Sequence, residues 1–240
     1  MSDVAARPRG EAHGHHHGDV SGGWLRAAVF GAMDGLVSNT ALVAGVAGGG
    51  AAPRTIVLSG VAGLIAGAIS MALGEYTSVR TQNEQLDLEV AKERRELERN
   101  PAGELAELAQ MYRARGLDPE LADQVAAQLT RDPATALQEH VTAELGVSPG
   151  ERPSPYVAAS SSLLTFALGA AFPLLPYLVG VPLLWVALLS GGIGLVVAGA
   201  LSSRFTPRPW WYAGLRQLLF GVAAAAITYL IGTAIGVTVS

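Results

Sequence analysis

The stretch VFGAMDGLVSNTALVAGVAG, residues 29–48, holds twenty residues of which only Asp34 carries a charge. An apolar run of this length matches the ~20 residues that a helix needs to cross the hydrocarbon core of a bilayer. The run lacks the alternation of apolar and polar residues that marks the strands of a membrane barrel. Because backbone polar groups in lipid must be satisfied within the segment, the stretch predicts a membrane-spanning helix.

The same character extends over most of the chain. Half of the 240 residues are hydrophobic and 15% are charged, and the mean hydropathy is positive at +0.34. The charges gather in one central region, which both flanks lack over long distances. The sequence therefore predicts an all-α membrane protein with five transmembrane helices and a polar insertion between the second and the third. The predicted spans cover about residues 24–48, 54–77, 156–178, 181–203 and 212–238.

The charge distribution also predicts the domain boundaries. We expect a disordered, histidine-containing tail over 1–23, transmembrane helices one and two over 24–77, an acidic helical domain over 78–155 and helices three to five over 156–240. The histidines of the tail lie between His13 and His17. Such a tract can bind metal weakly, and a tail without a defined role is the alternative.

Basic residues predict the orientation in the membrane. They precede the first span, are frequent in the insertion and recur between spans four and five at Arg204, Arg208 and Arg216, whereas the opposite loops carry only Arg54. Because cytoplasmic loops hold an excess of Lys and Arg, we expect the N-terminus and the insertion in the cytoplasm. The Ala, Gly and Arg usage suggests a bacterial source and hence a multi-pass protein of the bacterial plasma membrane.

Two side chains inside the predicted spans favour a metal site. Asp34 lies ten residues past Trp24, or ~15 Å along a helix and near the middle of the bilayer. A carboxylate at that depth is costly unless it faces a partner, a cavity or a proton. The antiparallel second span brings Met71 to a similar depth, with Glu75 one turn nearer the cytoplasm as an entrance residue. Carboxylate and thioether together suit Fe²⁺ better than Mg²⁺ or Ca²⁺.

Each of these side chains also has a structural interpretation. A protonated Asp34 bonded to a neighbouring helix and a gap-filling Met71 are the alternatives. Prolines 173, 176 and 182 cluster where the third span meets the fourth and suit a tight turn. Small residues are expected to let spans one and two approach closely. These are Gly31, Gly35, Gly45, Gly63 and Gly67.

The insertion predicts four helical pieces. Residues 77–99, TSVRTQNEQLDLEVAKERRELER, continue the second span without a break. Three later dipeptides, Asn100-Pro101, Asp118-Pro119 and Asp132-Pro133, each pair an N-cap residue with proline at the first helical position. Gly116 and Gly146 are typical C-terminal stops. We therefore expect a long extension followed by three short helices.

Carboxylates at helical spacing give the insertion a second candidate metal site. Between residues 78 and 151 there are fifteen Asp and Glu against eight Lys and Arg. Residues three or four apart share a helix face, so such groups can chelate cations, and an imidazole suits iron or zinc. A solvated charged face is the ordinary alternative. The side chains concerned are Glu93, Glu96, Glu104, Glu107, Glu139, His140 and Glu144.

The motifs FGAMDGLVSN and AGAISMALGEYTSV, residues 30–39 and 66–79, resemble the two signature helices of the vacuolar iron transporter family. The resemblance runs from about Trp24 to the C-terminus. It implies five transmembrane helices, a homodimer and exchange of cytoplasmic Fe²⁺ for protons. The intramembrane ligands of the family match Asp34 and Met71.

The resemblance also implies a cytoplasmic metal-binding domain in the insertion. His140 stands near a position where the family often has Met, which bears on the metal preference. The residues that the resemblance assigns to this domain are Glu93, Glu96, Glu104, Glu107 and Glu144.

These observations predict a proton-coupled antiporter that moves Fe²⁺, and other divalent ions such as Mn²⁺, Co²⁺ or Zn²⁺, out of the cytoplasm for iron detoxification and homeostasis. We expect no enzyme activity, no prosthetic group and no nucleic-acid partner; the absence of cysteine excludes disulfides and thiolate sites.

Two other classes of protein remain open at this point. A membrane-bound metal sensor or scaffold would not need a charge in mid-bilayer. A membrane-anchored iron storage or oxidation protein would need the helical Glu-x-x-His motif of di-iron sites. That motif is absent, because Glu139 and His140 are adjacent and neither Glu93 nor Glu104 is followed by His three residues on.

Overall fold

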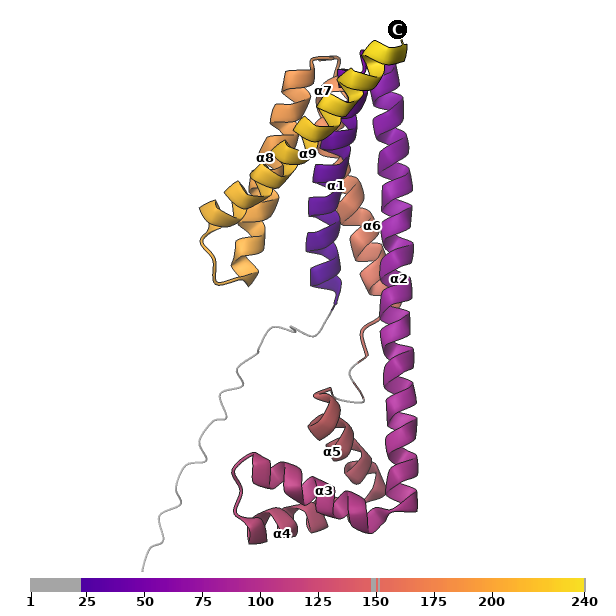
Figure 1. The fold of residues 1–240 in the computed structure, drawn as a ribbon, viewed down its shortest axis with the longest axis vertical. Coiled ribbons are helices and arrows are strands. Elements are labelled where there is room, and N and C mark those ends of the chain that lie inside the picture. The colour runs from indigo at the N-terminus through magenta and orange to yellow at the C-terminus, as the bar shows by residue number, and fades with distance from the viewer. Residues whose placement is uncertain (1–22, 148–149, 151, 240) are drawn as a thin grey trace, which may run out of the picture.

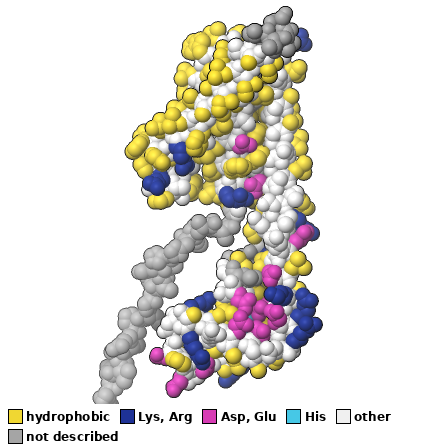
Figure 2. All heavy atoms as spheres, in the orientation of Figure 1, with side chains coloured by type: hydrophobic (Ala, Val, Ile, Leu, Met, Phe, Trp, Pro, Cys, Tyr) yellow, Lys and Arg dark blue, Asp and Glu magenta, His cyan; other side chains and the backbone are white. Residues whose placement is uncertain are grey.

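The computed structural model describes residues 23–147, 150 and 152–239, so the histidine-containing part of the predicted tail lies outside the described residues. The described chain is helical, and five of its segments are long and apolar enough to cross a membrane, as predicted. Apolar side chains cover this part of the molecule in Figure 2. The membrane helices are α1 (Trp24–Gly48), the first half of α2 (Pro53–Arg99), α6 (Pro155–Ala171) with α7 (Leu175–Leu178), α8 (Leu184–Ser202) and α9 (Trp210–Val239).

Helix α1 lies at the centre of the membrane part. It contacts α2, α6, α8 and α9 (Figure 1). The third span is not one straight helix, because Pro173 lies in a short 3₁₀ turn, Phe172–Leu174, that separates α6 from α7. This agrees with the expectation that the prolines mark a turn, since proline removes a helical hydrogen bond and crowds the preceding turn.

Glycines set the distances within the bundle, although not between the helices that we expected. The prediction that five glycines bring α1 and α2 together is wrong for four of them. Gly31 and Gly35 face α6, Gly45 faces α9, and Gly67 faces Phe166 of α6. Only Gly63 meets α1, at Leu42. Helix α6 packs against both α1 and α2, so it receives the small residues of both.

Helices α1 and α6 approach each other closely enough for their backbones to touch. A Cβ at Gly35 would collide with the carbonyl oxygen of Phe166, and a Cβ at Gly169 would collide with that of Ala32. Both obstacles are backbone atoms, which cannot rotate away. The two helices therefore pack at this distance only because neither position carries a side chain.

Helix α2 continues far beyond the membrane part, as predicted. It has 47 residues, or ~70 Å at 1.5 Å per residue. The three short helices that follow fold back against its distal half (Figure 1). Leu108, Ala109 and Ala126 form the core of this unit. The three helices are α3 (Pro101–Ala114), α4 (Pro119–Leu129) and α5 (Pro133–Leu145).

The predicted helix boundaries of the insertion are confirmed, with one difference in detail. The Asn100 side chain accepts a hydrogen bond from Gly103 N, and the Asp132 side chain accepts one from Thr135 N. Asp118 precedes Pro119 but makes no side-chain capping bond. Gly116 and Gly146 have φ of 97° and 67°, the left-handed conformation that ends helices.

The packing of α6 on α1 predicts a sharp difference between two Gly→Ala variants. Gly169→Ala should lower the free energy of unfolding by about 1–3 kcal/mol, because overpacking forces the helices apart. Gly74→Ala on α2 meets no atom within 4 Å and should be neutral or stabilising by up to about 1 kcal/mol. Melting temperatures of the purified proteins in detergent measure both. Equal melting temperatures for the two variants would contradict this packing.

Candidate metal sites

A groove between α1 and α2 brings the two predicted intramembrane ligands together. Its volume is about 360 Å³, and Asp34 and Met71 both line it. Gly63 and Gly67 of α2 also line it, and the side chains of Leu42 and Phe166 pack against these two glycines. The remaining lining residues are Ser38, Asn39, Leu42, Ser70 and Phe166. Of these, the serines and Asn39 were not identified from the sequence, although polar residues in an apolar span were the available signal.

Glu75, the predicted entrance residue, forms an ion pair between α2 and α1. It does not line the groove with Met71, although the two residues are one turn apart. Its carboxylate accepts a hydrogen bond from Arg26 Nη2 at 2.9 Å, with the Glu75 side chain 9% exposed and the Arg26 side chain 62% exposed. An ion pair therefore links α1 to α2 one turn beyond Met71. A role for Glu75 as an entrance residue requires Arg26 to release it.

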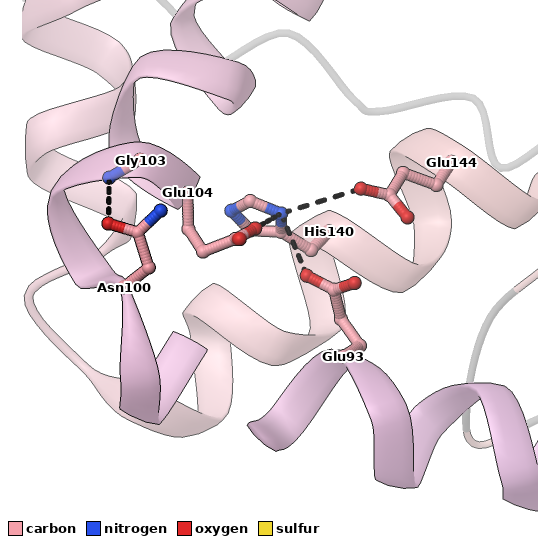
Figure 3. Close-up of polar contacts among 6 residues, drawn as sticks. All are labelled: Glu93, Asn100, Gly103, Glu104, His140 and Glu144. Atoms are coloured by element: carbon pink, nitrogen blue, oxygen red, sulfur yellow. Dashed lines mark hydrogen bonds and ion pairs between the residues drawn. The ribbon is translucent and has the colours of Figure 1, made fainter. Parts of the chain in front are cut away.

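The insertion assembles a second site from three helices. Glu93 of α2, Glu104 of α3 and His140 of α5 each offer one ligand atom, and these atoms lie within 4.8 Å of one another. His140 Nδ1 is 3.0 Å from Glu93 Oε1, 3.6 Å from Glu104 Oε2 and 3.9 Å from Glu144 Oε1. Figure 3 shows the three carboxylates converging on the imidazole. We call Glu93, Glu104, His140 and Glu144 the insertion cluster.

The bend between α2 and α3 creates this arrangement. Asn100 ends α2 and caps α3, and Glu104 falls in the first turn of the new helix. Gly103 is required at the cap because a Cβ there would collide with the Asn100 side chain. Glu104 is thereby turned back toward Glu93, which is eleven residues earlier in the chain.

Several polar atoms of the insertion cluster are buried without a hydrogen bond among the described residues. They are both ring nitrogens of His140, which is 0% exposed, and Glu93 Oε1; Nδ1 and Oε1 lie 3.0 Å apart and form an ion pair only when the imidazole is protonated. Buried polar atoms are almost always hydrogen-bonded, so a group of unbonded atoms facing one another needs a reason. A cation with carboxylate and imidazole ligands would satisfy them.

The carboxylates of this cluster repel one another. Burial, followed by the charges of Glu144, Glu104, Glu96 and Glu107 in that order, raises the pKa of Glu93 from 4.5 to about 7. Burial, followed by the charge of Glu107, raises the pKa of Glu104, while His140 lowers it. The predicted residues Glu96 and Glu107 therefore act on the cluster through their charge. A bound cation would relieve this repulsion.

Glu139 points away from the insertion cluster. Its Oε2 accepts a hydrogen bond from the Tyr112 hydroxyl of α3 at 3.1 Å. Neighbouring residues on a helix point about 100° apart, so its position beside His140 in sequence does not place it beside His140 in space. The expectation that Glu139 is a metal ligand has no support in this geometry.

The match to known families covers nearly all of this structure. The model of the VIT family matches residues 25–233, which include both candidate sites. The chain belongs to the VIT family.

Several curated relatives agree with this assignment. The chain is 38% identical to the vacuolar iron transporter of Acanthamoeba castellanii, over 88% of this chain and 78% of the relative. It is 31% identical to vacuolar iron transporter 1 of Oryza sativa subsp. japonica, over 95% of this chain and 92% of the relative. Its identity to the vacuolar iron transporter of Centaurea cyanus is 32%, over 89% of each chain. The resemblance seen in the sequence motifs is confirmed.

The insertion cluster of this VIT-family protein predicts metal binding that depends on pH. Protons and metal compete for Glu93, whose pKa is about 7, so affinity should fall by about tenfold per pH unit below 7 and level off above it. Titration of the purified protein with Mn²⁺ at pH 5.5 to 8.5 measures this. Glu93→Gln should weaken binding and flatten the pH profile.

Glu139→Gln is the matched control, because it removes a carboxylate of α5 that is adjacent to His140 in sequence but faces Tyr112 instead. It should bind Mn²⁺ like the wild type. A wild-type profile in Glu93→Gln, or an equal loss in both variants, would show that the cluster is not the site.

Proposed function

We propose that the protein is a membrane transporter that carries Fe²⁺ across its membrane in exchange for protons. The observation that carries the proposal is the groove between α1 and α2, which holds Asp34 and Met71 inside the apolar spans. A carboxylate at that depth is characteristic of ion pathways and proton relays. Relatives with iron in their names support Fe²⁺ as the cargo. The protein is a transporter, not an enzyme.

The insertion, residues 78–155, collects the cargo in this proposal. It faces the cytoplasm, as the distribution of basic residues favours, and the insertion cluster captures cations before they reach the membrane. Export from the cytoplasm would then serve iron detoxification and homeostasis. The bacterial plasma membrane stays a prediction from composition, and the relatives named above are called vacuolar.

Exchange follows from competition for the same oxygen atoms. A cation arriving at Asp34 displaces a proton from the carboxylate, and protons from a more acidic far side displace the cation again. The Arg26–Glu75 ion pair lies between the insertion and the groove. A cation approaching Glu75 competes with Arg26 for the carboxylate, so the arrival of cargo would itself break the ion pair.

A second copy of the chain would complete the groove. Asp34 is only half-buried in the single chain, and its open side would expose a carboxylate to lipid. Such exposure is costly in a bilayer, so a homodimer that closes the groove, with a site from each copy, is part of the proposal. The carboxylate and thioether pair also accommodates Mn²⁺, Co²⁺ and Zn²⁺, which extends the range of cargo.

Variants of the groove test the proposal by Fe²⁺ uptake into proteoliposomes. Asp34→Ala should abolish uptake, because no carboxylate remains to exchange a proton for the ion. Met71→Leu keeps the volume and removes the sulfur, and it should lower uptake by about tenfold. Met33→Leu makes the same substitution beside Asp34 at a residue that does not line the groove, and it should transport normally.

Gel filtration of each variant checks that the protein still assembles. Wild-type uptake in an assembled Asp34→Ala protein would refute the transport site. Metal binding without uptake in the wild type would instead favour a sensor or scaffold.

A further inference from the structure

Asn39 lies in the inner wall of the groove, where α1 meets α6. It is only 2% exposed. Its amide nitrogen donates a hydrogen bond to the carbonyl oxygen of Ala170 at 2.5 Å. Ala170 is the next-to-last residue of α6, and a helix leaves its last four carbonyls without an intrahelical partner. The nitrogen of Asn39 therefore has a structural role at the end of α6.

That bond fixes the direction of the other end of the amide. Only the NH₂ group can donate to a carbonyl, so Oδ1 must point away from Ala170. It points toward α2, where a Cβ placed on Gly63 would lie 3.5 Å from it. Oδ1 is buried and has no hydrogen-bond partner among the described residues. The structural role of Asn39 leaves this acceptor unexplained.

An unbonded acceptor inside a membrane span requires a donor. Water cannot reach it from the lipid, and leaving it unpaired is costly. Asn39 and Gly63 both line the groove that holds Asp34 and Met71, so a donor for Oδ1 would come from what enters this groove. The neighbouring Thr40 differs, because its unbonded hydroxyl lies against Gly191 of α8 and borders another cavity.

We propose that Asn39 Oδ1 receives a hydrogen bond from the water shell of the transported cation, and that Asn39 is a positioning and specificity-determining residue. This inference rests on the proposed transport function. Asn39 lies five residues beyond Asp34, or ~7.5 Å farther along α1 from its cytoplasmic end. A neutral oxygen holds a cation more weakly than a carboxylate does, which lets the ion leave Asp34 without being trapped at the next position.

The chemistry of the amide oxygen also gives a preference among cations. Oxygen ligands and retained water suit Mn²⁺ and other hard ions, whereas Zn²⁺ favours nitrogen and sulfur with fewer ligands. Loss of Oδ1 should therefore reduce transport of hydrated Fe²⁺ and Mn²⁺ more than that of Zn²⁺. A purely structural Asn39 would affect all three ions equally.

Uptake kinetics in proteoliposomes test the inference with two variants that act differently. Asn39→Leu removes both the NH₂ donor and the Oδ1 acceptor of the side chain. Gly63→Ala keeps the bond to Ala170 and places a methyl group 3.5 Å from Oδ1, once the flexible Leu42 side chain, which lies nearer, has moved aside. Each should raise the KM for Fe²⁺ by about tenfold, the effect of one lost hydrogen bond, and raise the Zn²⁺ to Fe²⁺ flux ratio. Asn39→Asp, which in its protonated form keeps a donor and an acceptor, should stay within about threefold of the wild type.

Thr40→Val is the matched control, because it removes the adjacent buried polar group that faces α8. It should leave KM and the flux ratio unchanged. Wild-type kinetics in Gly63→Ala, or equal changes in Asn39→Leu and Thr40→Val, would overturn the inference. If Asn39→Leu fails to assemble, the kinetics of Gly63→Ala decide the question. If these variants transport normally while Asp34→Ala is inactive, only the role of Asn39 fails; normal transport in Asp34→Ala would refute the transport function itself.

Discussion

The membrane part depends on the direct contact between the backbones of α1 and α6 at Gly35 and Gly169. Lipid offers no hydrophobic force between apolar helices, so close packing of small residues must supply the attraction. This contact seats Ala170 beside Asn39 and places Phe166 at one side of the groove. The position of Asp34 relative to Met71 follows from it, because α6 packs against both α1 and α2.

Helix α2 links the groove to the insertion cluster. One unbroken helix carries Met71 and Glu75 within the membrane part and Glu93 far outside it. The cap at Asn100 then turns the chain back, and α3 and α5 bring Glu104 and His140 to Glu93. Both candidate sites therefore share one helix, but their chemistry differs. The insertion cluster has carboxylates and an imidazole, whereas the groove has one carboxylate and a thioether.

The sequence predicted features that depend on local rules. Span lengths, the long α2, the proline starts of α3, α4 and α5, and the shared depth of Asp34 and Met71 follow from hydropathy, capping and helical rise. It was wrong about the glycines of α1, which face α6 and α9, because that answer depends on which helices are neighbours. For the same reason, it did not predict the bonds of Glu75 to Arg26 and of Glu139 to Tyr112. Side-chain direction around a helix cannot be assigned until the packing partner of each face is known.

In the proposed exchange, metal and protons compete for the same carboxylates and so move in opposite directions. Proteoliposomes loaded with one dye for Fe²⁺ and one for pH measure both movements at once, with the interior made either acidic or equal to the outside. An acidic interior should accelerate Fe²⁺ entry, and the internal pH should rise in proportion to the iron that enters. Fe²⁺ entry at the same rate without a pH gradient, and with no change in internal pH, would contradict the proposed exchange.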